Sequence, residues 1–171
     1  MQKQYLNTIV KKAESLTDMI NTFHDYSKLE HPEFCLVRET QDLAEYLREY
    51  LAEKYDEIDL GGFNLEVEIP EETVSYSFDR VQMKRVFDNI MSNICKYTQD
   101  HTRVYVNVED AGDQVRMIFK NISKYPLNIS SDELMERFVR GDASRNTEGH
   151  GLGLSIASSL TALMDGQLTI D

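Results

Sequence analysis

Cysteine is scarce in this sequence, and its scarcity limits how the chain can be held together. Only two of the 171 residues are cysteines, Cys35 and Cys95, and they lie far apart, with no partner at a spacing typical of a metal site. The chain must therefore fold without crosslinks, and 41% apolar residues are enough to close the core of one domain of this length. These features are typical of a protein in a reducing cytosol.

Basic residues are also few. The sequence has 18 Lys and Arg against 30 Asp and Glu, which gives a formal net charge of −12. A field of this sign repels phosphate backbones and anionic lipid surfaces, so nucleic acid is not an expected partner. A phosphate-rich ligand would need local relief from that field, supplied by a metal ion, a helix N-terminus or a few cationic side chains.

Long apolar runs are missing as well. No run approaches the roughly 18 residues that a membrane span requires, and the start Met1-Gln2-Lys3-Gln4 lacks the apolar segment of a signal peptide. The sequence also contains no internal repeat and no low-complexity tract. The chain is therefore expected to be soluble and cytoplasmic, without membrane contact of its own.

The first thirty residues carry an apolar stripe with helical spacing. The stripe predicts a helix over about residues 2–30, which His31-Pro32 ends because the residue before a proline is pushed out of the α region. Its heptad period is typical of a dimer helix, while a helix packed on its own domain is the alternative. The stripe consists of Leu6, Ile9, Ala13, Leu16, Ile20, Phe23 and Ser27.

The rest of the chain predicts alternating helices and strands, with Thr40 capping a second helix and Asp79 a third. The predicted order begins with an extended stretch at 34–37, a helix with the face Leu43, Tyr46, Leu47, Tyr50 and Leu51, and a strand at 63–69. A helix follows that carries Val81, Val86, Phe87, Ile90, Met91 and Ile94, and then a hairpin at 104–108 and 115–119. The last elements are a helix with Leu152, Ile156, Leu160 and Leu163 and a final strand at 167–170. Between 121 and 149 the periodicity weakens around one short helix, capped by Ser130 with Glu133. A stretch of this kind in a compact domain is more often a functional lid than an ordinary connection.

Glycines recur where this weakly patterned stretch ends and a helix begins. Gly149, Gly151 and Gly153 leave backbone amides unblocked, and the first amides of a helix have no internal partners. The helix dipole adds positive potential there, so the loop can hold phosphate oxygens. A flexible hinge before a helix would produce the same pattern, and both interpretations stay open.

Two asparagines lie four residues apart in a mostly apolar helix. Asn89 and Asn93 project from the same face, with Lys96 and Tyr97 one turn later. Buried amides must be paired, so they either satisfy local backbone groups or hold a ligand. Their carbonyl oxygens suit a hard cation such as Mg²⁺, a lysine can meet phosphate charge, and a tyrosine ring can stack on a base.

These motifs follow one another in a definite order. They are Asn89-x-x-x-Asn93-x-x-Lys96-Tyr97 on a helix, a hairpin, a lid containing Glu136-Arg137-Phe138-Val139-Arg140, and Gly149-His150-Gly151-Leu152-Gly153-Leu154 opening another helix. In order and spacing the chain resembles the ATP-binding domain of sensor histidine kinases. The resemblance implies an α/β (α+β) two-layer sandwich with a mixed, mostly antiparallel sheet covered by helices, preceded by one long amphipathic helix. Residues 1–31 would be the second helix of the family's dimerisation and phosphoacceptor hairpin, and 32–171 the catalytic domain, truncated at its C-terminal end.

The resemblance also implies a role for each motif residue. Asn93 would bind Mg²⁺, and Asn89 would support it directly or through water. Lys96 would approach the phosphates of ATP, and Tyr97 the adenine. Gly149, Gly151, Leu152 and Gly153 would form the phosphate loop, Phe138 would anchor the lid, and Arg140 and Arg145 would reach the γ-phosphate. The predicted catalytic residues are thus Asn89, Lys96, Arg140 and Arg145.

Two departures from the family pattern matter. Where the family places Asp-x-Gly-x-Gly after the hairpin, this chain has Asn121 and no glycine, so Asn121 would accept the adenine hydrogen bond through its carbonyl oxygen. No histidine stands in the family's phosphoacceptor context. His24-Asp25 has the acidic neighbour but lies on the second helix of the hairpin and lacks the following proline.

The predicted function is that of the catalytic region of a two-component sensor histidine kinase. It would bind ATP and Mg²⁺ and donate the γ-phosphate to a histidine outside this sequence, for relay to a response-regulator aspartate. The parent would be a homodimer through the N-terminal helix and a membrane-bound bacterial sensor. Alternatives are a catalytically degenerate ATP-binding scaffold and an ATPase or protein serine kinase of the same fold. Asn89 argues against the ATPase, since water activation favours a glutamate there, and the heptad helix argues against the serine kinase.

Overall fold

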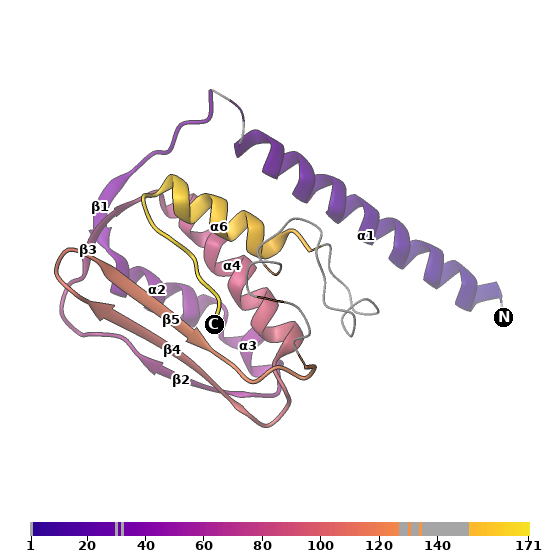
Figure 1. Cartoon of the computed structure of the whole chain (residues 1–171). Coiled ribbons are helices and arrows are strands. Elements are labelled where there is room, and N and C mark those ends of the chain that lie inside the picture. Colours follow the sequence, from indigo (N-terminus) through magenta and orange to yellow (C-terminus); the bar gives the residue numbers. More distant parts are fainter. Residues whose placement is uncertain (1, 30, 32, 127–129, 131–133, 135–150) are drawn as a thin grey trace.

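The computed structural model (Figure 1) describes residues 2–29, 31, 33–126, 130, 134 and 151–171. It begins with helix α1 (Gln2–Leu29), which extends away from the rest of the molecule. The predicted apolar stripe is uncovered, whereas Leu29, at the end of the helix, is buried in the core with 8% exposed. The exposed stripe residues are Leu6, Ile9, Leu16, Ile20 and Phe23, each 55–66% exposed. The long amphipathic helix is therefore confirmed, and no helix in the described part of the chain is long and apolar enough to cross a membrane.

A three-stranded sheet forms one layer of the molecule. Its central strand β4 (Arg103–Asp110) runs parallel to β2 (Asn64–Glu68) and antiparallel to β5 (Val115–Lys120). Because side chains alternate along a strand, Val104, Val106 and Val108 of β4 are all buried in the core. A separate antiparallel pair is formed by β1 (Glu39–Asp42) and β3 (Ser75–Phe78).

Helices form the second layer and cover one side of the sheet (Figure 1). They are α2 (Leu43–Glu53), the short α3 (Tyr55–Asp59), α4 (Arg80–Tyr97) and α6 (Gly153–Leu163). Asp42 and Asp79 begin α2 and α4 by accepting hydrogen bonds from first-turn amides. The rings of Phe78 and Phe87 are fully buried between the layers. This arrangement is the predicted α+β two-layer sandwich.

Several local predictions were wrong. Thr40 does not cap a helix but lies in β1. Asp42 is the cap, because its carboxylate accepts hydrogen bonds from first-turn amides of α2, and it also accepts one from Val74 N–H on the neighbouring segment. The segment 167–170 is not a strand, because among the described residues its backbone forms no ladder. Strands β1 and β3 and helix α3 were not predicted. For the short helix after Ser130, Glu133 lies outside the described residues.

Candidate functional site

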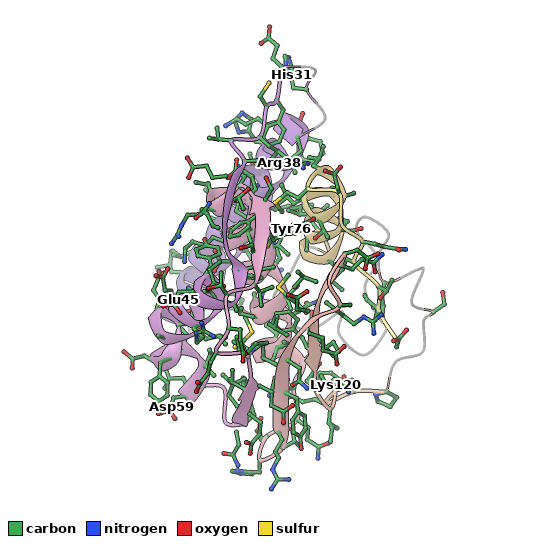
Figure 2. The ribbon with its side chains drawn as sticks, turned by 90° about the vertical axis from the view of Figure 1, so that its left-hand side faces the viewer. His31, Arg38, Glu45, Asp59, Tyr76 and Lys120 are labelled. Atoms are coloured by element: carbon green, nitrogen blue, oxygen red, sulfur yellow. The ribbon has the colours of Figure 1, made fainter. Side chains whose placement is uncertain are left out.

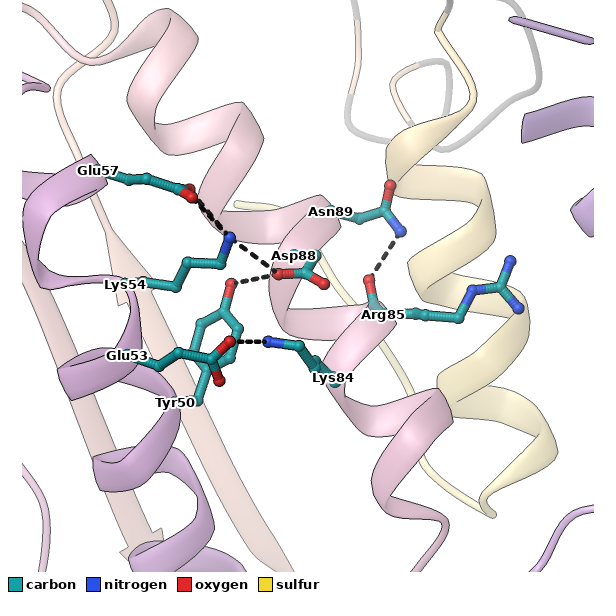
Figure 3. Close-up of polar contacts among 8 residues, drawn as sticks. All are labelled: Tyr50, Glu53, Lys54, Glu57, Lys84, Arg85, Asp88 and Asn89. Carbon is teal, nitrogen blue, oxygen red and sulfur yellow. Dashed lines mark hydrogen bonds and ion pairs between the residues drawn. The ribbon is translucent and has the colours of Figure 1, made fainter. Parts of the chain in front are cut away.

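Asn89 lies on the side of α4 that faces α6 (Figure 3). Its amide nitrogen donates to the Arg85 carbonyl at 2.8 Å, one turn earlier on the same helix. This bond holds the side chain so that the carbonyl oxygen, Oδ1, points to the start of α6. A Cβ placed on Gly153 would lie 3.0 Å from that oxygen. The structure therefore brings together two predicted site residues that are far apart in sequence.

The N-terminus of α6 differs from those of α2 and α4. Leu152 occupies the N-cap position and its side chain forms no cap hydrogen bond, and among the described residues no other side chain accepts one from the first amides of α6. The Ser155 hydroxyl, in the first turn of α6, donates to the Leu152 carbonyl at 2.9 Å. Within the described part of the chain, the first-turn amides and the positive end of the helix dipole thus remain available to an anion beside Asn89.

Gly151 supplies the turn into α6. Its φ angle is +69°, a left-handed conformation that costs a residue with a Cβ roughly 1 kcal/mol or more. Glycine is therefore favoured at this position by backbone geometry, whichever ligand the loop meets. The hinge and the phosphate-loop interpretations both fit this one observation, but only the second also accounts for the uncapped helix that follows.

The segment after β5 lies against the other end of the same helix. Gln99 N–H donates to the Ile122 carbonyl, and Lys124 N–H donates to the Tyr97 carbonyl, both at 2.7 Å. These bonds place exposed Asn121 beside the C-terminal end of α4, close in sequence to the bridge between Thr98 and Ser123. The predicted base-recognition segment therefore does lie next to Tyr97.

Thr98 is a residue of this region that the sequence interpretation missed. It is fully buried, and among the described residues nothing hydrogen-bonds to its Oγ1. A buried hydroxyl without a partner costs about 1–3 kcal/mol, so an added donor or acceptor is favoured at this end of α4. Its sequence signal was weak, because threonine is mostly an exposed residue and nothing in the sequence indicates that this one is buried.

Between these two ends, α4 offers a strip about 12 Å long, from Asn89 to Tyr97, at 1.5 Å per residue. Asn93 is half-buried in the middle of the strip, and no hydrogen bond holds its amide within the described part of the chain. Lys96 is exposed one turn later. Groups of three or more His, Cys, Asp or Glu that could hold a metal are absent from the described residues, so a cation here would depend on amide oxygens and on the ligand's own phosphates.

The opposite face of α4 carries an unpredicted polar cluster (Figure 3). The Tyr50 hydroxyl donates to Asp88 Oδ1 at 3.0 Å, and Lys54 Nζ lies 3.9 Å from the same oxygen while bonding Glu57 at 2.9 Å. Burial, followed by the Asp88 charge, raises the pKa of Tyr50 far above its ordinary value, so the hydroxyl stays protonated and keeps donating. Burial likewise raises the pKa of the nearby Cys95 thiol.

This cluster borders a hollow of about 470 Å³ between α2, α3 and α4. Asn89 and Lys96 contribute to its lining, but most of the lining belongs to the face with Asp88, Ser92 and Cys95. The hollow therefore shares Asn89 and Lys96 with the strip that connects Gly153 with the 121–124 segment, but most of it lies on the side of α4 that faces α2 and α3. We place the candidate site on the strip, because the uncapped helix and the converging backbone segments lie there.

A sequence profile of the family described as histidine kinase-, DNA gyrase B-, and HSP90-like ATPase matches residues 78–171, more than half of the chain. The chain belongs to this ATPase family. The matched range of the ATPase-family domain begins just before the cap of α4, so it includes every element of the strip described above.

Curated relatives of the domain are sensor proteins. Sensor protein VanS of Enterococcus faecium is 28% identical over 167 residues, which are 96% of this chain and 43% of that protein. The probable sensor protein PcoS of Escherichia coli is 31% identical over 172 residues, which are 99% of this chain and 36% of that protein. The chain thus spans less than half the length of these relatives.

Solved structures confirm the fold of the ATPase-family domain. Full-length ShkA in complex with AMPPNP has a TM-score of 0.77 at 20% identity, covering 98% of this chain and 35% of that one. The nucleotide-free catalytic domain of histidine kinase ThkA has a TM-score of 0.65 at 22% identity, covering 75% of this chain and 82% of that one. The first likeness includes the N-terminal helix as well as the sandwich.

Four predicted site residues of the ATPase-family domain lie outside the described residues. They are Phe138, Arg140, Arg145 and Gly149. Their assignment to the lid and the phosphate loop stays a prediction, as do the individual roles of the residues on the strip.

Proposed function

We propose that this domain is the ATP-binding catalytic region of a two-component sensor histidine kinase, using Mg²⁺ and donating the γ-phosphate of ATP to a histidine outside residues 1–171. The single observation that carries the proposal is the close approach of Asn89 Oδ1 to Gly153, where an added Cβ would lie 3.0 Å from that oxygen, at the start of α6. It joins an amide oxygen to a set of available backbone amides, and phosphoryl transfer mainly requires positioning and charge neutralisation.

The strip on α4 and the start of α6 beside it have distinct tasks in this proposal. The first-turn amides of α6 bind phosphate oxygens, and Gly151 gives the chain the turn that aims them. Asn93 and Asn89 offer carbonyl oxygens to the cation, which neutralises phosphate charge when bound. Lys96 adds a positive charge in a chain whose net charge is −12.

The base would lie at the opposite end of the strip. Tyr97 and Asn121 flank that end. The position of the 121–124 segment supports base recognition even though its sequence lacks glycines. Phe138, Arg140, Arg145 and Gly149 keep their predicted lid and phosphate-loop roles in the proposal.

The same proposal assigns residues 1–31 to the second helix of a dimerisation hairpin and 32–171 to the catalytic domain. The exposed stripe on α1 supports a homodimer, because burial against a partner helix would remove five large apolar side chains, each 55–66% exposed, from water. A response-regulator receiver domain would accept the phosphate. A membrane-bound bacterial parent, with this domain in the cytoplasm, accords with the sensor proteins among the relatives.

Calorimetric titration with ATP tests the metal assignment. Asn93→Ala should weaken binding about tenfold, roughly 1.4 kcal/mol, when Mg²⁺ is present. The matched control is Asn107→Ala, another half-buried asparagine, whose amide binds Glu68 on the sheet and which should bind ATP normally. Without Mg²⁺, Asn93→Ala and the unmodified chain should bind equally. An equal loss with and without Mg²⁺ would show that Asn93 does not hold the cation.

A transfer assay tests the kinase activity. The chain is mixed with the phosphoacceptor hairpin of its own parent and radiolabelled ATP at saturating concentration. Label on the hairpin supports the kinase, and its acid lability identifies phosphohistidine. ATP binding without transfer would favour the catalytically degenerate scaffold, and release of inorganic phosphate without labelling would favour an ATPase.

A further inference from the structure

The segment that connects α1 to β1 touches both helices of the candidate site. This connector, residues 33–38, has no helix or strand of its own. Val37 N–H donates to Asp79 Oδ2 at 2.9 Å, while Asp79 Oδ1 accepts from Gln82 N–H and so caps α4. One buried carboxylate, with the residue only 6% exposed, thus binds the connector and the start of α4 together.

The next residue of the connector holds the end of α6. The guanidinium of Arg38 donates to the Leu163 carbonyl and forms an ion pair with Asp165 at 2.5 Å. A cation at this position also interacts favourably with the negative end of the helix dipole. The Tyr76 hydroxyl of β3 donates to the adjacent Met164 carbonyl at 2.7 Å. Figure 2 places Arg38 and Tyr76 at the same end of the molecule.

The two anchors lie at the same end of a helix pair. Helices α4 and α6 pack against each other in opposite directions, so the start of α4 is near the end of α6 (Figure 1). At 1.5 Å per residue, Asp79 is about 15 Å from Asn89 along α4. Arg38 holds Leu163, which is also about 15 Å from Gly153 along α6. The connector therefore fixes one end of both helices, and the proposed nucleotide strip lies at the other.

At the far end of the pair, α4 and α6 approach so closely that one helix has little room to move relative to the other. Asn89 Oδ1 occupies the space beside Gly153, since a Cβ added to Gly153 would lie only 3.0 Å from that oxygen. A small rotation of α6 about its anchored end would shift the first-turn amides away from Asn89. Because packed helices move as stiff units, a change at the anchor is transmitted along the full length of α6.

We propose that Arg38 is a positioning residue that sets the spacing between Asn89 and the first turn of α6, and so tunes the affinity of the strip for ATP. Asp79 performs the same task for α4. The inference rests on the proposed function for its ligand, but the geometry of the helix pair can be measured without any nucleotide.

The experiment compares Arg38→Ala, Arg38→Lys and the control Arg48→Ala in the whole chain. Arg48 matches Arg38 closely: its side chain is 34% exposed against 29%, it forms an ion pair with Glu45, and it donates to the Pro70 carbonyl. Two readouts are taken. One is the NMR shift of the Asn89 side-chain amide in the absence of nucleotide, and the other is ATP·Mg²⁺ affinity by calorimetry.

Arg38→Ala should move the Asn89 amide signal and weaken ATP binding about fivefold, within the range seen for couplings over such distances. Arg38→Lys should restore most of the affinity, because an ammonium can still reach the Leu163 carbonyl. Arg48→Ala should change neither readout. An unchanged Asn89 signal in Arg38→Ala would overturn the inference, as would an equal affinity loss in Arg48→Ala.

A second variant covers the other anchor. Asp79→Asn keeps an oxygen to cap α4 but turns the group that faces Val37 N–H into a donor, so it should also move the Asn89 signal. If the unmodified chain fails to bind ATP, the proposed function is refuted, while the Asn89 signal still decides whether Arg38 and Asp79 position the helix pair. If the Asn89 signal is unmoved in the Arg38 and Asp79 variants while ATP binding is normal, the positioning role of these two residues is refuted and the proposed function is not.

Discussion

Gly153→Ala offers a sharp test of the candidate site, because its effects on stability and on binding should differ. Gly153 has no positive φ, so alanine fits the backbone and should stabilise the chain by about 0.4–1 kcal/mol through the unfolded state. The new Cβ would lie 3.0 Å from Asn89 Oδ1, closer than the ordinary contact range of 3.4–4 Å. Asn89 must therefore move.

The structure indicates what that movement costs. The Asn89 amide is tied to the Arg85 carbonyl at 2.8 Å, so rotating it weakens a hydrogen bond worth about 0.5–1.5 kcal/mol. The two effects nearly cancel, and the free energy of unfolding should change by less than about 1 kcal/mol. ATP·Mg²⁺ affinity, in contrast, should fall about tenfold, or 1.4 kcal/mol, because the displaced oxygen belongs to the proposed cation site.

The assay is urea unfolding combined with calorimetry in two backgrounds. In Asn89→Ala, the remaining neighbour of the new methyl is the Cβ at position 89, at 3.9 Å, so the crowding disappears. Gly153→Ala should then stabilise the chain by about 0.4–1 kcal/mol and have no further effect on ATP affinity. Identical effects of Gly153→Ala in both backgrounds would refute the reasoning, since the predicted coupling between the two residues would be absent.

Two further predictions concern α2 and its surroundings. Partial burial raises the pKa of Asp42, but hydrogen bonds from Glu45, Val74 and Ala44 together lower it below its ordinary value of 3.8. The stabilisation that the ionised Asp42 carboxylate provides is therefore complete above that value and is lost as pH falls through the lower folded-state pKa. In urea unfolding, the difference in free energy of unfolding between the unmodified chain and Asp42→Asn should therefore narrow below about pH 4. Tyr50→Phe should cost about 1 kcal/mol in the same assay by removing the bond to Asp88, while calorimetry should find ATP affinity unchanged within about twofold. A large affinity loss would mean that the nucleotide occupies the hollow on that face.

The sequence predicted those elements whose signal is local. Helix α4 has an aspartate cap and an apolar face of regular period, and both were visible without a structure. The valines of β4 alternate so regularly that the hairpin was equally clear. The placement of Asn89 and Asn93 on one face followed from helix geometry alone. The contact of Asn89 with Gly153 did not, since only tertiary packing decides which turn of α4 meets α6.

Strands β1 and β3 were missed for a physical reason. The β1 sequence Glu-Thr-Gln-Asp has no apolar side chain, because the strand is stabilised by pairing with β3 rather than by burial. For β3 a signal existed, since Val74, Tyr76 and Phe78 alternate toward the core, but a strand of four residues is too short for periodicity to identify. The final segment at 167–170 is the reverse case, a predicted strand that does not form. Its pattern predicts a strand, yet a strand also needs a neighbouring strand to pair with.

The two faces of α4 explain how so acidic a chain can offer a site for phosphate. Adjacent residues in a helix point about 100° apart, so Asp88 and Asn89 lie on different faces (Figure 3). The charge of Asp88 is directed toward α2, where Tyr50 donates to it and Lys54 lies nearby. The strip presents the amides of Asn89 and Asn93 and the charge of Lys96, and α4 itself places no carboxylate on it. Within α4, the register of the helix thus keeps its one carboxylate off the strip, and exchanging Asp88 and Asn89 would reverse that separation without altering the net charge of −12.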